Sequence, residues 1–229
     1  MNYMFRNAEL FEGNGLESWI TTSLTSLHYT FRGAKLINTN FASWDVSKVQ
    51  NMGNLFFQAS VFVGNGLETW QTGAVTSMWN TFNQATALNV NFGDWDVSKV
   101  NEMQRMFETA TVFTGAGLEK WSVSTVTDMA DTFLNANALT SCNKRKIADA
   151  WTLISSATFV DTTTYDTDWA SDTCPVRCVC VCVCVCVCVG EASDVMFSME
   201  GLIHTDTCTC IRPWYFLHPV IRYTVIKTC

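Results

Sequence analysis

The chain has few charged residues and few histidines, and it lacks the sequence motifs of the common enzyme classes. Only 15% of its 229 residues are charged and the net charge is −7, so the basic face that binds phosphate groups is missing and nucleic acid is not expected as a partner. Its three histidines, His28, His204 and His218, are scattered, and no G-x-S-x-G, P-loop or H-E-x-x-H motif occurs. We therefore predict that the protein is not an enzyme and has no catalytic, cofactor-binding or metal-binding residue.

Long apolar runs and early cysteines are missing as well. No stretch of about 20 apolar residues occurs, so no membrane-spanning segment is expected, and the first residues, MNYMFRNAEL, lack the basic and long apolar regions of a secretory signal. None of the 11 cysteines precedes Cys142, whereas most of them are crowded between Cys174 and Cys188. Such a step in composition marks a boundary between two kinds of sequence.

What the chain does contain is a repeat of 25 or 26 residues. The stretch FASWDVSKVQNMGNLFFQA at 41–59 returns as FGDWDVSKVNEMQRMFETA at 92–110, and weaker copies lie between and beside them. Tryptophan, phenylalanine, valine, methionine and alanine columns recur at this period, and stacking of the copies would bury them as continuous apolar rows. We predict that the core of the repeats contains Phe31, Trp44, Val49, Met52, Phe56, Ala59, Phe82, Trp95, Val100, Met103, Phe107 and Ala110.

Periods of this length are typical of solenoids. Alternating apolar and polar residues at 44–49 predict a short strand in each coil, and the spacing of apolar residues at 52–59 predicts one or two helical turns. The longer copies carry one extra residue beside paired glycines, as in VGNGLETW at 63–70, which indicates a turn that absorbs the insertion. We expect the stacked aromatic residues to be core and not a sugar-binding strip.

The motif F-x-x-A, followed by W-D-V-S-x-V-x-x-M-x-x-[ML]-F, resembles the repeat of BspA-like surface proteins, a leucine-rich-repeat-type family. The resemblance covers residues 1 to about 174, and W-D-V-S is intact at Trp44 and Trp95, whereas the longer copies depart from it with WITTSL, WQTGAV and WSVSTV. It implies an LRR-like α/β solenoid that is extracellular or at the cell surface. It also implies adhesion to, or binding of, a protein or glycan, without enzyme activity. The alternative is a passive structural stalk that only spaces other domains.

Both ends of the array depart from the repeat. Residues 4–8 match the middle of a copy, 106–110, so we expect a solenoid over 1–139 that is truncated at its N-terminus. ALTSCNKRKIADAWTLISSATF at 138–159 predicts an amphipathic helix and thus a C-terminal cap over 140–175; its apolar face holds Ile147, Ala150, Trp151 and Ile154. The cap is similar to the closing element of algal-type members of the same family, which implies a disulfide between Cys142 and Cys174. Two free thiols are the alternative.

One row of carboxylates follows the repeat. Glu17, Glu68 and Glu119 each precede a tryptophan by two residues in every longer copy, so we predict an exposed acidic row. Such a row is compatible with a weak Ca²⁺ site or a basic partner. We favour a solvated edge that opposes aggregation.

The tract CVCVCVCVCVCV at 178–189 admits three interpretations. Thiolates are ligands of soft metal ions, but strict alternation favours a strand with every cysteine on one face, from which a tetrahedral site does not form easily. A translated TG dinucleotide repeat would also encode alternating cysteine and valine. We interpret residues 176–229 as a low-complexity tract followed by an unstructured or spurious tail.

Overall fold

The protein is described from a computed structural model, which covers residues 1–162, 165–174, 177–181 and 185–189. The chain divides into two units, residues 1–173 and 174–229. In chain order the elements are the 3₁₀ helices η1 (Leu16–Ser18), η2 (Leu67–Thr69) and η3 (Leu118–Lys120), the helices α1 (Ser141–Thr162) and α2 (Tyr165–Asp168), and the strands β1 (Arg177–Val181) and β2 (Val185–Val189).

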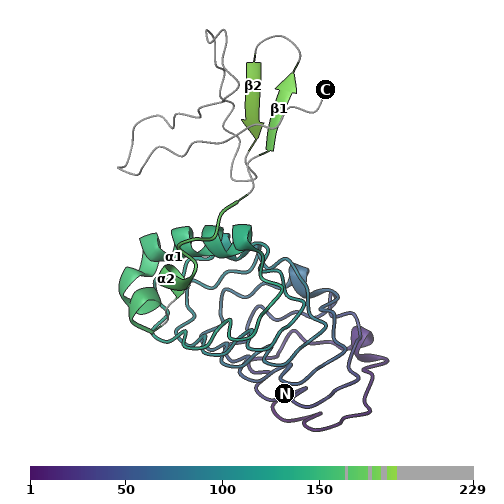
Figure 1. The fold of residues 1–229 in the computed structure, drawn as a ribbon. Coiled ribbons are helices and arrows are strands. Elements are labelled where there is room, and N and C mark those ends of the chain that lie inside the picture. Colours follow the sequence, from purple (N-terminus) through teal and green to yellow (C-terminus); the bar gives the residue numbers. More distant parts are fainter. Residues whose placement is uncertain (163–164, 175–176, 182–184, 190–229) are drawn as a thin grey trace. The chain divides into compact units, whose positions relative to one another are not determined.

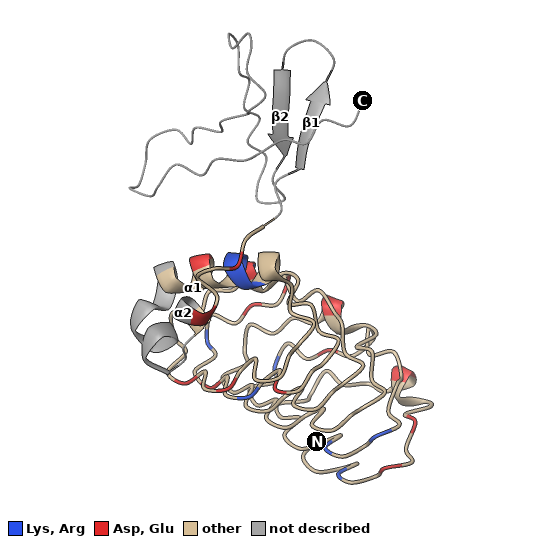
Figure 2. Ribbon diagram, in the orientation of Figure 1, with Lys and Arg blue, Asp and Glu red and all other residues tan. Residues whose placement is uncertain are grey.

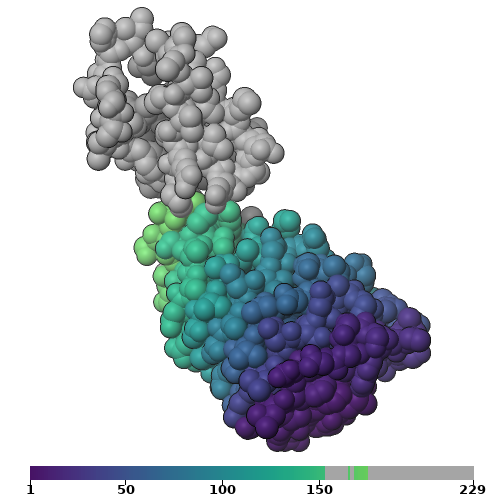
Figure 3. Space-filling model, turned by 90° about the vertical axis from the view of Figure 1, so that its right-hand side faces the viewer, coloured from purple at the N-terminus to yellow at the C-terminus, as the bar shows by residue number. Residues whose placement is uncertain are grey.

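The repeats of the first unit lie over one another as coils. Figure 1 shows the backbone returning beside itself in chain order, and in Figure 3 the coils form successive bands of colour from the first residue onward. Single parallel β-bridges connect each coil to the next at one repeat position, which is occupied by Ser26, Asn51, Ser77, Glu102 and Asp128. Every repeat therefore contacts its neighbours through its backbone.

The coils differ from the prediction in their local structure. Residues 1–139 contain no extended strand and no α-helix, only the bridges, tight turns and η1–η3. In WDVSKV, the side chain of Asp45 accepts the N–H of Ser47 at 3.0 Å, and Val49 donates to the carbonyl of Val46. This Asx-turn replaces the expected strand, because the aspartate side chain takes a backbone hydrogen bond that a ladder would need.

The predicted helical turns are replaced by a second arrangement. Asn54 and Gln58 have φ of 56° and 63°, a left-handed conformation that interrupts an α-helix. The N–H groups of Met52, Asn54, Phe56 and Gln58 donate to carbonyls of the next coil at 2.8–3.0 Å. The N–H groups of Leu55 and Ala59 instead close turns three residues back. Alternate backbone donors thus hold the coils together.

The core consists of aligned columns of side chains. All the residues that we predicted as repeat core are at most 3% exposed. From Phe5 to Phe133, phenylalanine rings of adjacent coils stack with centroids 5.4–5.9 Å apart and planes within 12° of each other. Burial of each ring stabilises the fold by roughly 1.5–3 kcal/mol, so the column is a major source of stability.

The tryptophans stack in pairs, which gives the array a period of two coils. Trp19 stacks on Trp44 at 6.4 Å and Trp70 on Trp95 at 6.1 Å. In both pairs the indole N–H of the second tryptophan donates to a leucine carbonyl of the preceding coil, Leu16 for Trp44 and Leu67 for Trp95. These leucines begin η1 and η2, so the glycine turn of every longer coil also positions the tryptophan of the shorter coil that follows.

The helix α1 extends this pattern over the last coil. Trp151 is fully buried, stacks on Trp121 at 6.3 Å and donates its indole N–H to the carbonyl of Leu118 at 3.0 Å. It therefore occupies the place of the next tryptophan in the column, although it is helical. Ile147 is buried and Ala150 partly buried beside it, whereas the side chain of Ile154 lies outside the described residues. Cys142 and Cys174 are both disulfide-bonded, and their pairing with each other stays a prediction.

Tyr165 in α2 provides a test of the cap. Its hydroxyl accepts the backbone N–H of Phe133 at 3.0 Å, and burial raises the pKa of this phenol to about 12. The folded state therefore favours the neutral phenol, whose pKa in the unfolded chain is about 10. Stability from this group is complete below pH 10 and is lost as the pH rises toward 12.

We expect the melting temperature to fall more steeply above pH 10 in the parent protein than in Tyr165→Phe, which has no phenol to ionise. At pH 8 the same substitution should cost about 1 kcal/mol, because one hydrogen bond is lost. Thermal unfolding between pH 8 and 11.5 measures both effects. Parallel pH profiles of the two proteins would show that Tyr165 does not hold the cap through its neutral hydroxyl.

In the second unit, β1 and β2 form an antiparallel two-stranded sheet, with Cys178 opposite Cys188 and Cys180 opposite Cys186. The alternation of cysteine and valine favours a strand, and β1 and β2 lie in this low-complexity tract. Valine has high β propensity, and the alternating tract has no charge or glycine to oppose pairing. The predicted unstructured or spurious tail, residues 190–229, lies outside the described residues.

Candidate binding surface

The predicted acidic row lies on the three 3₁₀ helices. Glu17 and Glu68 are exposed and Glu119 is partly buried, and Figure 2 shows acidic residues on these short helices. The carboxylate of Glu17 accepts the N–H of Gly15 at 3.0 Å and the hydroxyl of Thr39 at 3.2 Å. The glutamate therefore stabilises its own turn. Among the described residues, no group of three histidine, cysteine, aspartate or glutamate residues is arranged to hold a metal ion.

A hollow of about 280 Å³ lies beside η2 and next to Glu68; its other lining residues are Val63, Gly64, Asn65, Asn89, Val90 and Asn91. Two of the asparagine side chains that line the hollow already accept hydrogen bonds from backbone N–H groups. The amide oxygen of Asn89 accepts the N–H of Thr114 at 3.2 Å, and that of Asn91 accepts the N–H of Gly93 at 2.9 Å. The hollow is thus bounded by fixed asparagines at a glycine turn.

The aspartates of the W-D-V-S copies also accept hydrogen bonds from backbone N–H groups. Hydrogen bonds from the side chain and N–H of Ser47 lower the pKa of Asp45, and those of Ser98 lower the pKa of Asp96 in the same way. Both carboxylates therefore stay ionised and fix an Asx-turn. They are structural groups and not candidates for acid–base chemistry.

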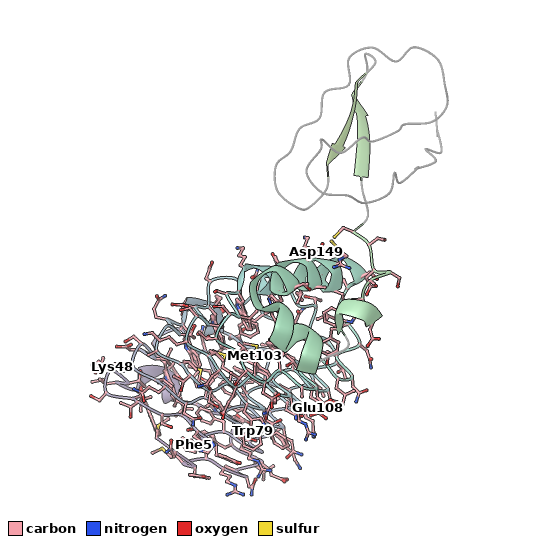
Figure 4. All side chains as sticks on the ribbon, turned by 90° about the vertical axis from the view of Figure 1, so that its left-hand side faces the viewer. Phe5, Lys48, Trp79, Met103, Glu108 and Asp149 are labelled. Atoms are coloured by element: carbon pink, nitrogen blue, oxygen red, sulfur yellow. The ribbon has the colours of Figure 1, made fainter. Side chains whose placement is uncertain are left out.

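A different surface carries several contacts between side chains of neighbouring coils. We call it the turn face, and it consists of the outward side chains of the turns between the methionine and alanine columns. In Figure 4, Glu108 lies in the lower part of the array, whereas Lys48 lies at its left-hand edge. The turn face includes Tyr3, Arg6, His28, Tyr29, Arg32, Phe57, Gln58, Gln84, Arg105, Glu108 and Asp131.

The first coils of the turn face contain a cation–aromatic cluster, which we define as Tyr3, Arg6, His28, Tyr29, Arg32 and Phe57. The rings of Tyr3 and Tyr29 stack at 5.0 Å, and His28 meets Tyr29 edge-on at 4.2 Å. Arg6 lies over both tyrosine rings, at 5.7 and 5.4 Å from their centroids. Cations held over aromatic faces are attracted by the ring quadrupole, so the cluster has a defined geometry.

Arg32 is the most constrained member of the cluster. Its guanidinium lies 5.5 Å from the centroid of Tyr29 and 4.8 Å from that of Phe57. Its Nε atom is buried and has no hydrogen-bond partner among the described residues. Within the described part of the chain, neither Arg32 nor Arg6 forms an ion pair with a carboxylate. Burial lowers the pKa of the neighbouring His28, so this imidazole is neutral near pH 7.

The last coils of the turn face are different in charge. Arg105 contacts Asp131 at 3.3 Å and Glu108 at 3.8 Å, and Glu108 also accepts a hydrogen bond from Asn83 at 2.8 Å. In these coils the guanidinium of Arg105 therefore pairs with two carboxylates. The turn face therefore changes from unpaired arginines in the first coils to paired and net acidic residues in the last.

A second hollow has a volume of about 260 Å³, and two of the residues that line it follow members of the cluster in the sequence. Lys35 lies three residues after Arg32, and Gln58 directly follows Phe57; the remaining lining residues are Ser60, Gln84, Thr86 and Thr109. The amide of Gln58 donates to that of Gln84 at 3.1 Å, and Lys35 pairs with Glu9 at 2.9 Å. Hydroxyl and amide groups of this kind are suited to hydrogen bonding with a polar ligand.

The sequence comparison decides the family. The family described as "Mycoplasma protein of unknown function, DUF285" matches residues 1–66 and 60–168. The chain belongs to the DUF285 family. The two matches together span all the coils and reach into α2, so the coils and the cap are both part of the DUF285 region. No curated protein and no solved structure matches the chain.

The repeats in the sequence indicated the core residues and the acidic row of this DUF285 protein, but they did not indicate the cation–aromatic cluster. Its members occupy columns that change residue type from coil to coil, whereas a repeat is recognised by the columns that stay constant. A signal was present, because Tyr3 and Tyr29, and likewise Arg6 and Arg32, are separated by 26 residues, the length of one repeat. No helix among the described residues combines the length and apolar character needed to cross a bilayer.

Proposed function

We propose that this DUF285 chain is a non-enzymatic binding module that acts outside the cell or at its surface, and that its ligand contacts the turn face. The observation that carries this proposal is the contrast between the two sides of each turn. The inward columns keep one residue type, as with Phe56 and Phe82, whereas the column of Tyr29 changes to Arg105 and Asp131 in the last coils, where both residues are at least partly exposed.

A constant scaffold with changing outward residues is the usual design of repeat proteins that bind ligands over an extended surface. A passive stalk needs only solvated side chains on its surface. The stacked rings and unpaired arginines of the cation–aromatic cluster favour binding over the stalk, because partly exposed aromatic residues and arginines are enriched at binding sites.

We further propose that the coils form an LRR-like solenoid of the BspA-like surface-protein type. The repeat motif and the stacking of coils at 25–26 residues support this class. Disulfide-bonded Cys142 and Cys174 support an oxidising location, because disulfides persist mainly outside the cytosol.

The test is binding of the full chain to a glycan array and to intact cells. We expect saturable binding that falls at least tenfold in the double variant Tyr29→Ala, Phe57→Ala, because both substitutions remove ring area from the turn face. The variant Glu68→Gln, in the acidic row, is the matched control and should bind as the parent does. Absence of binding to every surface would favour the stalk, and turnover in a hydrolase screen would overturn the non-enzymatic assignment.

A further inference from the structure

We propose that the cation–aromatic cluster binds a sugar that carries a single carboxylate, with the carboxylate on the arginines and the sugar ring on the tyrosines and the adjacent hollow. This inference rests on the proposed binding function and deepens it by naming a ligand class. It is carried by three features of the structure: unpaired and oriented arginines, exposed aromatic surface, and polar groups beside them.

The arginines provide a site for one carboxylate. Because Arg32 lies against Tyr29 and Phe57, its planar guanidinium is already oriented and loses little freedom when a ligand binds. Arg6 occupies the same repeat position one coil earlier, roughly 5 Å away by the spacing of paired backbones. A carboxylate accepts two parallel hydrogen bonds from a guanidinium, which is a strong and geometrically specific interaction.

The aromatic and polar groups fit a sugar ring. Tyr29 and Phe57 are only partly buried, so part of each ring is accessible as apolar surface to the C–H groups of a pyranose. The hollow lined by Gln58, Ser60 and Thr86 offers amide and hydroxyl groups, and Gln58 directly follows Phe57 along the chain, whereas the ammonium of its Lys35 is already paired with Glu9. A ligand pocket with apolar surface and a few placed polar groups is the usual arrangement for small polar ligands.

The charge distribution of the turn face favours a ligand with one negative charge over a polyanion. The unpaired cations of the cluster are Arg6 and Arg32, whereas the last coils of the same face carry Glu108 and Asp131. The chain as a whole has a net charge of −7, which repels a polyanion that extends beyond the cluster. A monoanionic sugar satisfies both arginines without meeting the acidic coils, so it fits better than nucleic acid or a highly sulfated polymer.

The experiment uses the full chain with methyl β-D-glucuronide, and with methyl β-D-glucoside as the matched control, which has a CH₂OH group in place of the carboxylate. We expect a dissociation constant of about 1 mM for the glucuronide by NMR titration, as is reasonable for a ligand of this size. The glucoside should bind at least tenfold more weakly, because it lacks the charge-assisted hydrogen bonds. Acetate should also bind at least tenfold more weakly, since it has no ring.

Variants locate the site. Arg32→Gln should weaken glucuronide binding at least tenfold. Arg6→Gln, at an exposed position, repeats the test where folding is not at risk. Lys48→Gln, which removes an exposed cation outside the turn face, should leave binding unchanged. The binding constant should fall only weakly as the salt concentration rises, because a monoanion has no condensed counterions to release and its attraction to the arginines is only screened, and not with the steep slope of a polyanion.

Equal binding of glucuronide and glucoside, or of glucuronide by the parent and both arginine variants, would overturn the inference. So would tighter binding of a single-stranded oligonucleotide with a steep salt slope, which would assign the cluster to nucleic acid. If glycan-array or cell binding persists and still depends on Tyr29 and Phe57 while glucuronide does not bind, only this inference fails. If no surface binds the chain at all, the proposed function fails with it.

Discussion

Replacing Gly66 with alanine should destabilise the array by about 3 kcal/mol or more. Gly66 has φ of 86°, and an added Cβ would collide with the backbone nitrogen and Cα of Ala42 in the preceding coil. That nitrogen is fixed, since it donates to the side chain of Asn40 at 2.8 Å. The left-handed conformation costs a residue with a Cβ about 1–2 kcal/mol, and the forced separation of two packed coils adds roughly 1–3 kcal/mol.

Gly15 provides a matched control at the same turn of the first coil. Its φ is 90°, but nothing lies within 4 Å of the position of an added Cβ. Gly15→Ala should therefore show only the conformational cost, about 1–2 kcal/mol. Urea unfolding of both variants followed by circular dichroism measures the difference, which is the contribution of coil stacking at this point. Equal destabilisation by the two substitutions would contradict the close approach of Gly66 to Ala42.

Trp151→Ala should destabilise the cap and the last coil by about 3–5 kcal/mol, the range for removal of a buried tryptophan. The indole is fully buried, stacks on Trp121 and lies 5.8 Å from the ring of Phe133. Its loss exposes the end of the aromatic columns, and arrays of stacked repeats depend on capping of their terminal repeats. Thermal unfolding followed by near-ultraviolet circular dichroism reports the loss of tryptophan packing.

The substitution Trp151→Phe measures the contribution of the indole hydrogen bond to stability separately from that of ring stacking. Phenylalanine retains most of the stacking area but cannot donate to the carbonyl of Leu118, which Trp151 does at 3.0 Å. We expect a cost of about 1–3 kcal/mol, because the carbonyl is left without this buried donor and part of the volume is lost. If Trp151→Ala were as stable as the parent, α1 would not serve as the continuation of the tryptophan column.

The sequence predicted the packing of this protein better than its backbone conformation. Phe56, Phe82 and Phe107 recur at one period, and a column of identical apolar residues has few ways to be buried other than by stacking. The strand expected at Trp44 to Val49 fails because Asp45 forms an Asx-turn with Ser47. The expected helix fails because Asn54 and Gln58 adopt positive φ. The spacing of apolar residues in the sequence indicates which side chains point into the core. It does not determine the backbone conformation, because several conformations are compatible with the same spacing.

The candidate site was harder to predict, for a physical reason. Glu17 and Glu68 were found because they recur, and recurrence reflects a shared local role, which for Glu17 is a hydrogen bond to its own turn. The cation–aromatic cluster depends on the contact of Arg6 with Tyr29 and on that of Arg32 with Phe57, which together join three coils. Only the lateral register of the coils brings such residues together, and that register follows from the backbone turns that the sequence did not indicate.

The central claim of this account is that corresponding side chains of consecutive coils lie directly over one another. Phe56 and Phe82 are the best pair to test it, because both are fully buried and their rings are 5.9 Å apart and nearly parallel, at 5°. A double-mutant cycle with Phe56→Leu and Phe82→Leu measures the coupling free energy. The control is the cycle of Phe31→Leu with Phe107→Leu, which lie three coils apart. We predict a coupling of about 0.5–1.5 kcal/mol for the adjacent pair and additivity for the control; additivity in both cycles would contradict the stacking of the coils.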